Sequence, residues 1–224
     1  MGEQAEISGG EAVLVSIGRA GGRDLLTEAL ELGIDETLDA GMLRDLPVVG
    51  WAVKGAGVAA AVRDRLFAKK LIGFIAGTSS ASAAKTRTFL DELVEPTARR
   101  RAGETLLALI ERHERVEKSF VLGRLLVSRI EGHIGGQRFM ELAAALDRAT
   151  IDELRLIKRL QCDERIDDLD TIWGLARTGM VTVQFNEVNR YVAMGHYLNP
   201  LGIQMVQFGL GDLDVGVNAP ADFP

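Results

Sequence analysis

The feature that most constrains this fold is a helical spacing of apolar residues that persists from Arg63 to Gln161. Leu66, Phe67, Leu71 and Phe74 are three to four residues apart, which is the period of a helix that buries one face. The pattern breaks at Gly77-Thr78-Ser79-Ser80 and resumes, so we expect a second helix capped by Ser79 or Ser80. Its expected inward-facing residues are Phe89, Leu90, Leu93 and Val94.

Further along, the pattern predicts three more helical stretches. Pro96 ends one helix and can start the next, which extends over 97–132 either as two helices meeting near Ser119 or as one long helix. After Gly135-Gly136, an amphipathic helix is expected, with Phe139, Leu142, Ala143 and Leu146 inward. Thr150 followed by Glu153 has the form of a capping box, which predicts a helix from 151 to about 161.

In the C-terminal part of the chain, the sequence pattern predicts strands as well as helices, which together form a small mixed module. A helix carrying Ile166, Leu169, Ile172, Trp173 and Ala176 at helical spacing should end at Gly179. Strands at 180–185 and 191–198, joined by the polar turn 186–190, predict a hairpin, and Asn199-Pro200 should open a last helix. Two helices, a hairpin and a closing helix form a winged-helix-like order.

The predicted fold class is therefore mainly α, a helical bundle with a small C-terminal winged-helix-like module containing one β-hairpin. We divide the chain into an acidic N-terminal arm with a short helix at 23–33 (1–40), the bundle (41–148), and the module with its tail (149–224). The run Ala12 to Ile17 suits either a short strand or a loose arm, and we favour the arm because chain termini are often poorly ordered.

Residues 46–62 form the most apolar segment, with Lys54 near its middle. Spanning a bilayer takes about 20 apolar residues, and a central lysine costs about 2.5–3.5 kcal/mol on insertion scales. We therefore favour a buried or interfacial helix over a membrane span.

The net charge of −6 is unevenly distributed along the chain. Residues 1–40 carry 2 basic and 9 acidic side chains, 41–148 carry 18 and 12, and 149–224 carry 6 and 11, so the segments have charges of −7, +6 and −5. An apolar segment followed by basic residues can contact a protein partner or an anionic membrane surface, although a bundle also exposes such residues. The predicted contact residues are Trp51, Lys54, Arg63, Arg65, Lys69 and Lys70.

Enzyme signatures are weak, so we predict no catalytic, cofactor or metal residue. His113, His133 and His196 have no partner at metal-ligand spacing. Cys162 adjoins Asp163 and Glu164, whose charge disfavours a thiolate, and as a single cysteine it cannot form an internal disulfide. The glycines at 18–22 follow a β-prone run, but the P-loop lysine is missing.

The winged-helix-like order also suggests a DNA-binding transcription regulator as an alternative. Its expected recognition helix, 167–177, begins with Asp167, Asp168 and Asp170 and contains one arginine, Arg177. Three carboxylates would repel phosphate, so a protein-interaction role is favoured and nucleic acid is disfavoured as a partner.

Three short motifs resemble those of a type of uncharacterised bacterial helical protein and, more distantly, those of the abortive-infection Abi-alpha family. They are Leu46-Pro47-Val48-Val49-Gly50, Arg63-Asp64-Arg65-Leu66-Phe67-Ala68-Lys69-Lys70, and His196-Tyr197-Leu198-Asn199-Pro200-Leu201-Gly202. Asn199 stands where the family-like pattern has threonine, and both residues can cap a helix. The resemblance implies a role in bacterial stress or phage defence and transfers no catalytic residue.

Together these features predict a non-enzymatic bacterial regulatory or defence-associated protein without a cofactor. It would bind a protein partner or a membrane surface through residues 46–70, and homo-oligomer formation stays open. The first residues lack the basic start and apolar run of a signal peptide. We therefore expect a cytoplasmic protein, with peripheral association at the inner membrane if the contact surface is lipid.

Overall fold

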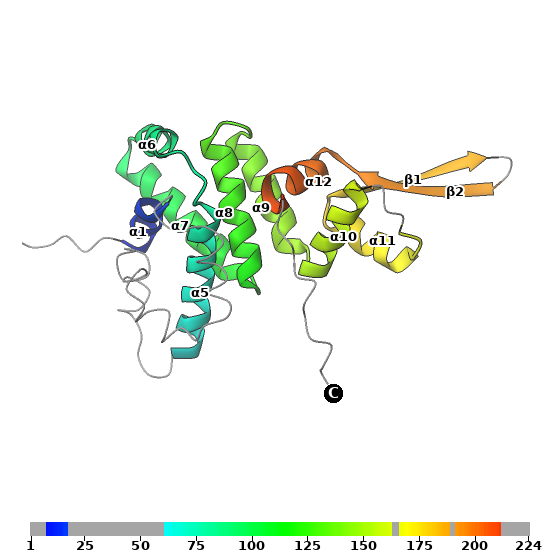
Figure 1. Cartoon of the computed structure of the whole chain (residues 1–224), viewed down its shortest axis with the longest axis horizontal. Coiled ribbons are helices and arrows are strands. Elements are labelled where there is room, and N and C mark those ends of the chain that lie inside the picture. Colours follow the sequence, from blue (N-terminus) through cyan, green and yellow to red (C-terminus); the bar gives the residue numbers. More distant parts are fainter. Residues whose placement is uncertain (1–7, 18–60, 163–165, 189–190, 212–224) are drawn as a thin grey trace, which may run out of the picture. The chain divides into compact units, whose positions relative to one another are not determined.

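The computed structural model describes residues 8–17, 61–162, 166–188 and 191–211. They form a mainly helical structure with one antiparallel hairpin near the C-terminal end, which confirms the mainly α class and the single hairpin of the prediction (Figure 1). These residues fall into two compact units that divide between Ala143 and Ala144. The division lies inside helix α9 (Gly136–Arg148), a few residues before the predicted boundary at 148.

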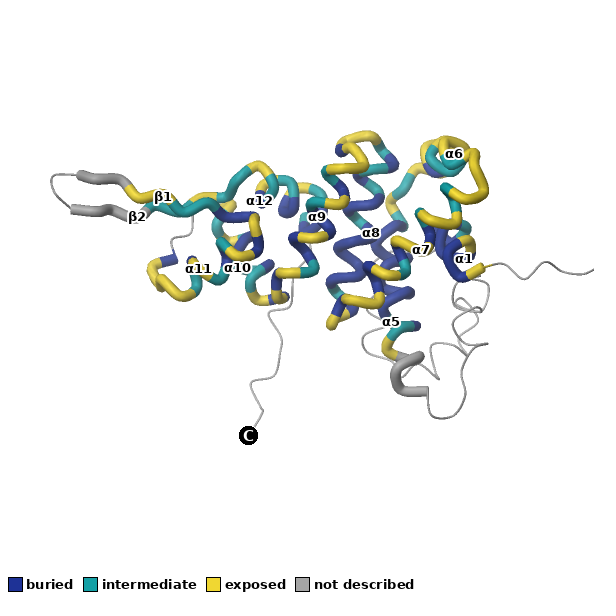
Figure 2. Tube along the Cα trace, turned by 180° about the vertical axis from the view of Figure 1, so that it is seen from behind, coloured by how far each residue is buried: buried dark blue, intermediate teal, exposed yellow. Residues whose placement is uncertain are grey.

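The described residues of the first unit form a bundle of helices. It contains α1 (Gly9–Ser16), α5 (Ala61–Gly77), α6 (Ala83–Glu92), α7 (Pro96–Arg112), α8 (Val116–Ile130) and the first half of α9. Helix α8 is buried along most of its length (Figure 2). Phe74 of α5 and Leu122 and Leu125 of α8 are fully buried and lie at the centre of this core.

Helices α5 and α8 approach each other closely because both carry glycine at the contact. A Cβ on Gly123 would lie 3.0 Å from the Cα of Gly77 and closer still to the carbonyl oxygen of Phe74. A Cβ on Gly77 would likewise collide with the carbonyl oxygen of Phe120. Only glycine leaves room for backbones at this separation, so these residues set the distance between the two helices.

The expectation of a loose arm or strand is wrong for residues 9–16. They form helix α1, whose Ala12, Val13 and Leu14 are at most 1% exposed. The helix packs on α7, where a Cβ on Gly10 would lie 2.9 Å from the backbone nitrogen of Glu104. The helix therefore has both a local N-cap, the Ser8 hydroxyl that accepts from the Glu11 amide, and a stabilising contact between residues more than 90 positions apart.

Helix α6 lies at the periphery of the first unit. Its N-cap is Ser82 rather than Ser79 or Ser80, and the Ser82 amide donates to the carboxylate of Glu131. Glu131 also pairs with Lys85 at 3.1 Å, and the Arg129 guanidinium lies 5.6 Å from the Phe89 ring. The prediction that Val94 faces inward is wrong, because this side chain, just beyond α6, is 79% exposed.

Several predicted boundaries are confirmed. Pro96 is the first residue of α7, and the stretch 97–132 is two helices, although they meet at His113–Arg115 rather than Ser119. The capping box is present at the start of α10 (Ile151–Gln161), where Thr150 and Glu153 each accept a hydrogen bond from the other's backbone nitrogen.

The second unit follows the predicted order. It contains α10, α11 (Leu169–Arg177), β1 (Val181–Val188), β2 (Tyr191–Leu198), α12 (Pro200–Gln204) and the π-helix η1 (Met205–Leu210). The strands pair antiparallel with Val181 opposite Leu198 and Phe185 opposite Met194. Strand β1 extends three residues beyond the predicted end, so the predicted turn at 186–190 begins too early. Asn199 caps α12 by accepting from the amides of Leu201 and Gly202, as predicted.

Two sequence predictions fall outside the described residues, namely the short helix at 23–33 and the apolar segment up to residue 60. Within the described residues, no helix combines the length and the apolar character needed to cross a bilayer.

Candidate functional site

The predicted contact residues of 46–70 have different positions in the structure. Trp51 and Lys54 lie outside the described residues. Arg63 and Arg65 belong to the first turns of α5, but their side chains are not described. Lys69 is half-buried, and the neighbouring Leu66 is 45% exposed.

Lys70 is an internal residue of the bundle rather than a surface contact. Its side chain is 8% exposed, and its Nζ donates a hydrogen bond of 3.0 Å to the carbonyl oxygen of Glu111, in the last turn of α7. A cation at this position satisfies a carbonyl and interacts favourably with the negative end of the helix dipole. Burial lowers the pKa of Lys70, and the Glu111 carboxylate opposes part of that shift.

A serine and a histidine lie together in the same region. His113 Nδ1 is 3.1 Å from Ser119 Oγ, which resembles a base beside a nucleophile. Both side chains are at most 1% exposed, and His113 Nε2 has no hydrogen-bond partner. Because a substrate has no access to either residue in this conformation, we interpret the pair as structural.

This pair predicts a pH-dependent stability. Burial, assisted by Lys118 and Lys70, lowers the pKa of His113 to about 4, whereas an unfolded histidine has a pKa of about 6.5. Between these values the unfolded state binds a proton that the folded state does not, so stability falls as the pH decreases. We expect a loss of about 2 kcal/mol between pH 8 and pH 5.

The measurement is urea unfolding at several pH values between 8 and 5 for the wild type and His113→Gln. In the variant, the free energy of unfolding should depend much less on pH in this range. The carboxylates whose pKa is lowered, Glu131 and Asp168, add to the pH dependence only at lower pH. Equal slopes in the two proteins would contradict this assignment.

The described residue set with the clearest functional character is the outer face of α11. Leu169, Asp170, Trp173 and Arg177 are all exposed on it, while Ile172 and Leu175 face the core. The Trp173 ring lies 6.2 Å from the ring of Phe185 on β1, which is 58% exposed. We call the set Leu169, Asp170, Trp173, Arg177 and Phe185 the α11 surface.

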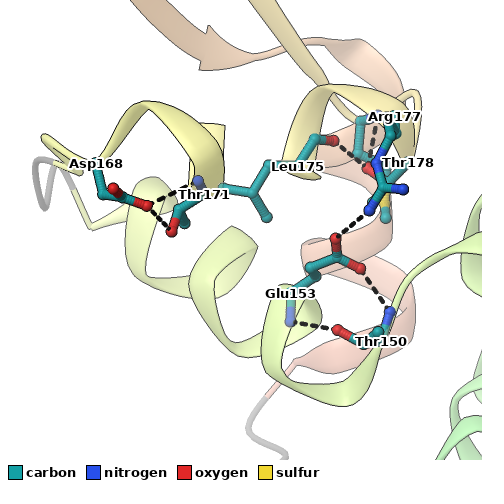
Figure 3. A network of polar contacts seen from close by, with 8 residues as sticks. Thr150, Glu153, Asp168, Thr171, Leu175, Arg177 and Thr178 are labelled. Atoms are coloured by element: carbon teal, nitrogen blue, oxygen red, sulfur yellow. Dashed lines mark hydrogen bonds and ion pairs between the residues drawn. The ribbon is translucent and has the colours of Figure 1, made fainter. Parts of the chain in front are cut away.

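Polar contacts cap both ends of α11, and two of them join its C-terminal end to neighbouring helices (Figure 3). The Asp168 carboxylate accepts from the amide and the hydroxyl of Thr171, which caps the first turn. At the other end, the Thr178 hydroxyl donates to Leu175 and Arg148 donates to the Thr178 carbonyl at 2.9 Å. Arg177 lies 3.8 Å from Glu153 of the α10 capping box. The contacts of Arg148 and Glu153 therefore join the C-terminal end of α11 to neighbouring helices, while its N-terminal end is closed by its own cap.

The charges of this surface are separated along the helix. Asp167, Asp168 and Asp170 are exposed at its start, and the exposed Arg177 is at its end. Hydrogen bonds from the Thr171 hydroxyl and amide lower the pKa of Asp168, which keeps it ionised. The first turn of α11 is thus negatively charged at neutral pH.

Sequence reasoning alone misses Trp173, Leu169 and Phe185 as surface residues. The helical spacing of five apolar residues predicts one buried face, but α11 has a buried side at Ile172 and Leu175 and an exposed apolar side at Leu169 and Trp173. The signal that could reveal the second side is the set of aspartates that alternate with these residues, since carboxylates are rarely buried.

The remaining candidates in the described ranges are a metal site and the cysteine. No group of three or more His, Cys, Asp or Glu residues there is arranged to hold a metal ion, and Cys162 is exposed. No family model, curated protein or solved structure matches this chain.

Proposed function

We propose that this chain is a non-enzymatic binding protein whose C-terminal unit is a winged-helix-like module that contacts a protein through the α11 surface. The observation that carries the proposal is the exposure of three large apolar side chains on adjacent elements. Leu169 is 55% exposed, Trp173 49% and Phe185 58%.

Clustered exposure of this kind is typical of interaction sites. Single exposed apolar residues are common on protein surfaces, whereas a group rimmed by charges is typical of an interface. Tryptophan is among the residues that most often dominate binding energy when an interface forms. The Trp173 ring also packs beside the Phe185 ring, which reduces the ordering of the Trp173 side chain that binding would require.

The charge of the surface favours protein over DNA. In the DNA-binding alternative, α11 would enter the major groove with its N-terminal residues against the bases. Asp167, Asp168 and Asp170 occupy that end, and Arg177 is the one basic residue of the helix. Without phosphate neutralisation by several basic groups, the main source of affinity for DNA is missing.

Among the described residues of the 46–70 segment, Lys70 is an internal side chain. Lys70 is engaged inside the bundle by Glu111, so it is not available to lipid headgroups in this conformation. The resemblance to the Abi-alpha family suggests that the binding serves bacterial regulation or phage defence, and this part of the proposal rests on the three short motifs alone.

The proposal is tested by placing a photo-crosslinking phenylalanine derivative at position 173 in bacterial cells that produce the protein. We expect a light-dependent adduct with a protein, because an aromatic side chain at 173 would lie inside the interface. The same derivative at the exposed Gln161, the last residue of α10, should give no adduct.

The surface is verified by adding Leu169→Asp to the position-173 protein, which should abolish the adduct by adding a charge to the apolar centre. An adduct that survives Leu169→Asp, or crosslinks to DNA alone, would contradict the proposal. A duplex mobility shift that persists at moderate salt and disappears in Arg177→Ala would support the DNA alternative.

A further inference from the structure

The exposed residues of α11 are complementary to themselves when two copies of the helix are placed antiparallel. Successive helix residues are separated by about 100° and about 1.5 Å. Relative to Trp173, Asp170 and Arg177 therefore lie on the same side of the helix, at about 60° and about 40°. They are on opposite sides of Trp173 along the axis, about 4.5 Å before it and about 6 Å after it.

Two antiparallel copies of the helix can be related by a two-fold axis that passes beside Trp173. In the second copy the residues then run in the opposite order along the helix axis, but each residue stays on the same side of Trp173 as in the first copy. Arg177 of one copy then faces Asp170 of the other with an axial offset of about 1.5 Å, which an arginine side chain spans easily. The same operation brings Leu169 against Ala176 of the second copy on the other side of Trp173. Each of these contacts occurs twice, because an isologous interface repeats every interaction.

We propose that the occupant of the α11 surface is a second copy of this chain, packed antiparallel through α11 about Trp173. This inference rests on the proposed function and specifies its partner. The charge pattern carries it: the carboxylates are at one end of the exposed face, the arginine is at the other, and apolar residues lie between them. A helix with only acidic groups on this face would repel its own copy.

The geometry makes a specific prediction about charge reversal. Arg177→Glu places a carboxylate opposite Asp170 twice, and Asp170→Arg places a guanidinium opposite Arg177 twice, so each variant should dimerise at least roughly tenfold more weakly. In the double variant Asp170→Arg/Arg177→Glu the pairs are opposite in sign again, so dimerisation should return. An equimolar mixture of the two single variants should form a heterodimer for the same reason.

The measurement is sedimentation equilibrium of the full chain at low and moderate salt, with circular dichroism of every variant. Arg100→Glu is the matched control, since it disrupts an exposed ion pair with Glu104 on α7 and changes no residue of the α11 surface, and it should dimerise like the wild type. The double variant also controls for folding, because it still carries a carboxylate at position 177 near Glu153. The ion pair between residue 177 and Glu153 is therefore lost in the double variant as well, so restored dimerisation cannot be attributed to recovery of that ion pair.

At a protein concentration of about 100 µM, a dimer with a dissociation constant of about 1 µM would be largely formed. A wild type that is monomeric at this concentration would overturn the inference. A double variant that stays as weak as the single variants would also overturn it. The crosslink at position 173 separates the two proposals. A monomer that still crosslinks to a different protein removes only the second-copy inference, whereas a monomer without a protein adduct removes the proposed function as well.

Discussion

Replacing Gly123 by alanine is expected to destabilise the first unit by about 2–4 kcal/mol, despite the greater helix propensity of alanine. The added Cβ would lie 3.0 Å from backbone atoms of Gly77 and closer to the carbonyl oxygen of Phe74. These neighbours are main-chain atoms of a packed helix, so they cannot rotate away as a side-chain end would. Helices α5 and α8 would have to separate along a fully buried contact.

The higher helix propensity of alanine acts in the opposite direction, and its effect on stability is smaller. Alanine is favoured over glycine inside a helix by about 0.8–1 kcal/mol, which only partly offsets the cost of moving two helices apart. Thermal and urea unfolding of the variant measure the net effect, and for a chain of this size we expect the melting temperature to fall by about 5–15 °C.

Gly136→Ala is the matched control for this substitution. Gly136 is the first residue of α9, and the nearest neighbour of an added Cβ would be the side chain of Arg129 at 3.8 Å, an ordinary contact distance. This variant should be as stable as the wild type or slightly more stable. If Gly123→Ala proved equally harmless, the close approach of α5 and α8 would be wrong.

Local signals predict the parts of this fold that local chemistry determines. The Thr150–Glu153 capping box, the proline at the start of α7 and the Asn199 cap of α12 each involve residues within three positions of one another, and each is present. The hairpin follows from the same kind of signal, and its second strand has the predicted bounds.

The errors occur where distant residues decide the structure. The β-branched and apolar run at 12–17 suits a strand or an arm, but α1 has a local cap at Ser8, and Gly10 and Gly103 allow the helix to pack closely on α7. Likewise, α11 carries apolar residues on more than one side, and periodicity alone does not indicate which side faces the core. The position of Phe185 beside Trp173 determines the character of that surface, and it depends on the tertiary arrangement of α11 and β1.

The position of Lys70 illustrates the same limit at a predicted contact residue. Lys69 and Lys70 are equivalent in sequence, but adjacent helix residues point about 100° apart. Lys69 is half-buried, whereas Lys70 is 8% exposed and bonded to the Glu111 carbonyl. A basic pair that suggests a membrane contact therefore contains one residue that stabilises the bundle.

This difference predicts opposite outcomes for two adjacent charge reversals. Lys70→Glu should destabilise the protein by about 2–4 kcal/mol, because it removes a charged donor and leaves a part-buried carboxylate facing a carbonyl oxygen. Lys70→Met keeps the apolar stem and should cost only about 1–3 kcal/mol, for the lost hydrogen bond. Lys69→Glu should change stability by about 0.5 kcal/mol or less. Urea unfolding monitored by circular dichroism ranks the three variants.

The same series separates a structural role from a membrane role. If Lys70 acts inside the bundle, vesicle binding by the folded Lys70→Met protein should equal that of the wild type for vesicles containing anionic lipid. Lys69→Glu, which preserves the fold, is then the variant that measures any electrostatic contact of this segment with lipid. A Lys70→Glu protein as stable as the wild type would contradict the buried position of Lys70, because an unpaired carboxylate cannot be accommodated there without cost.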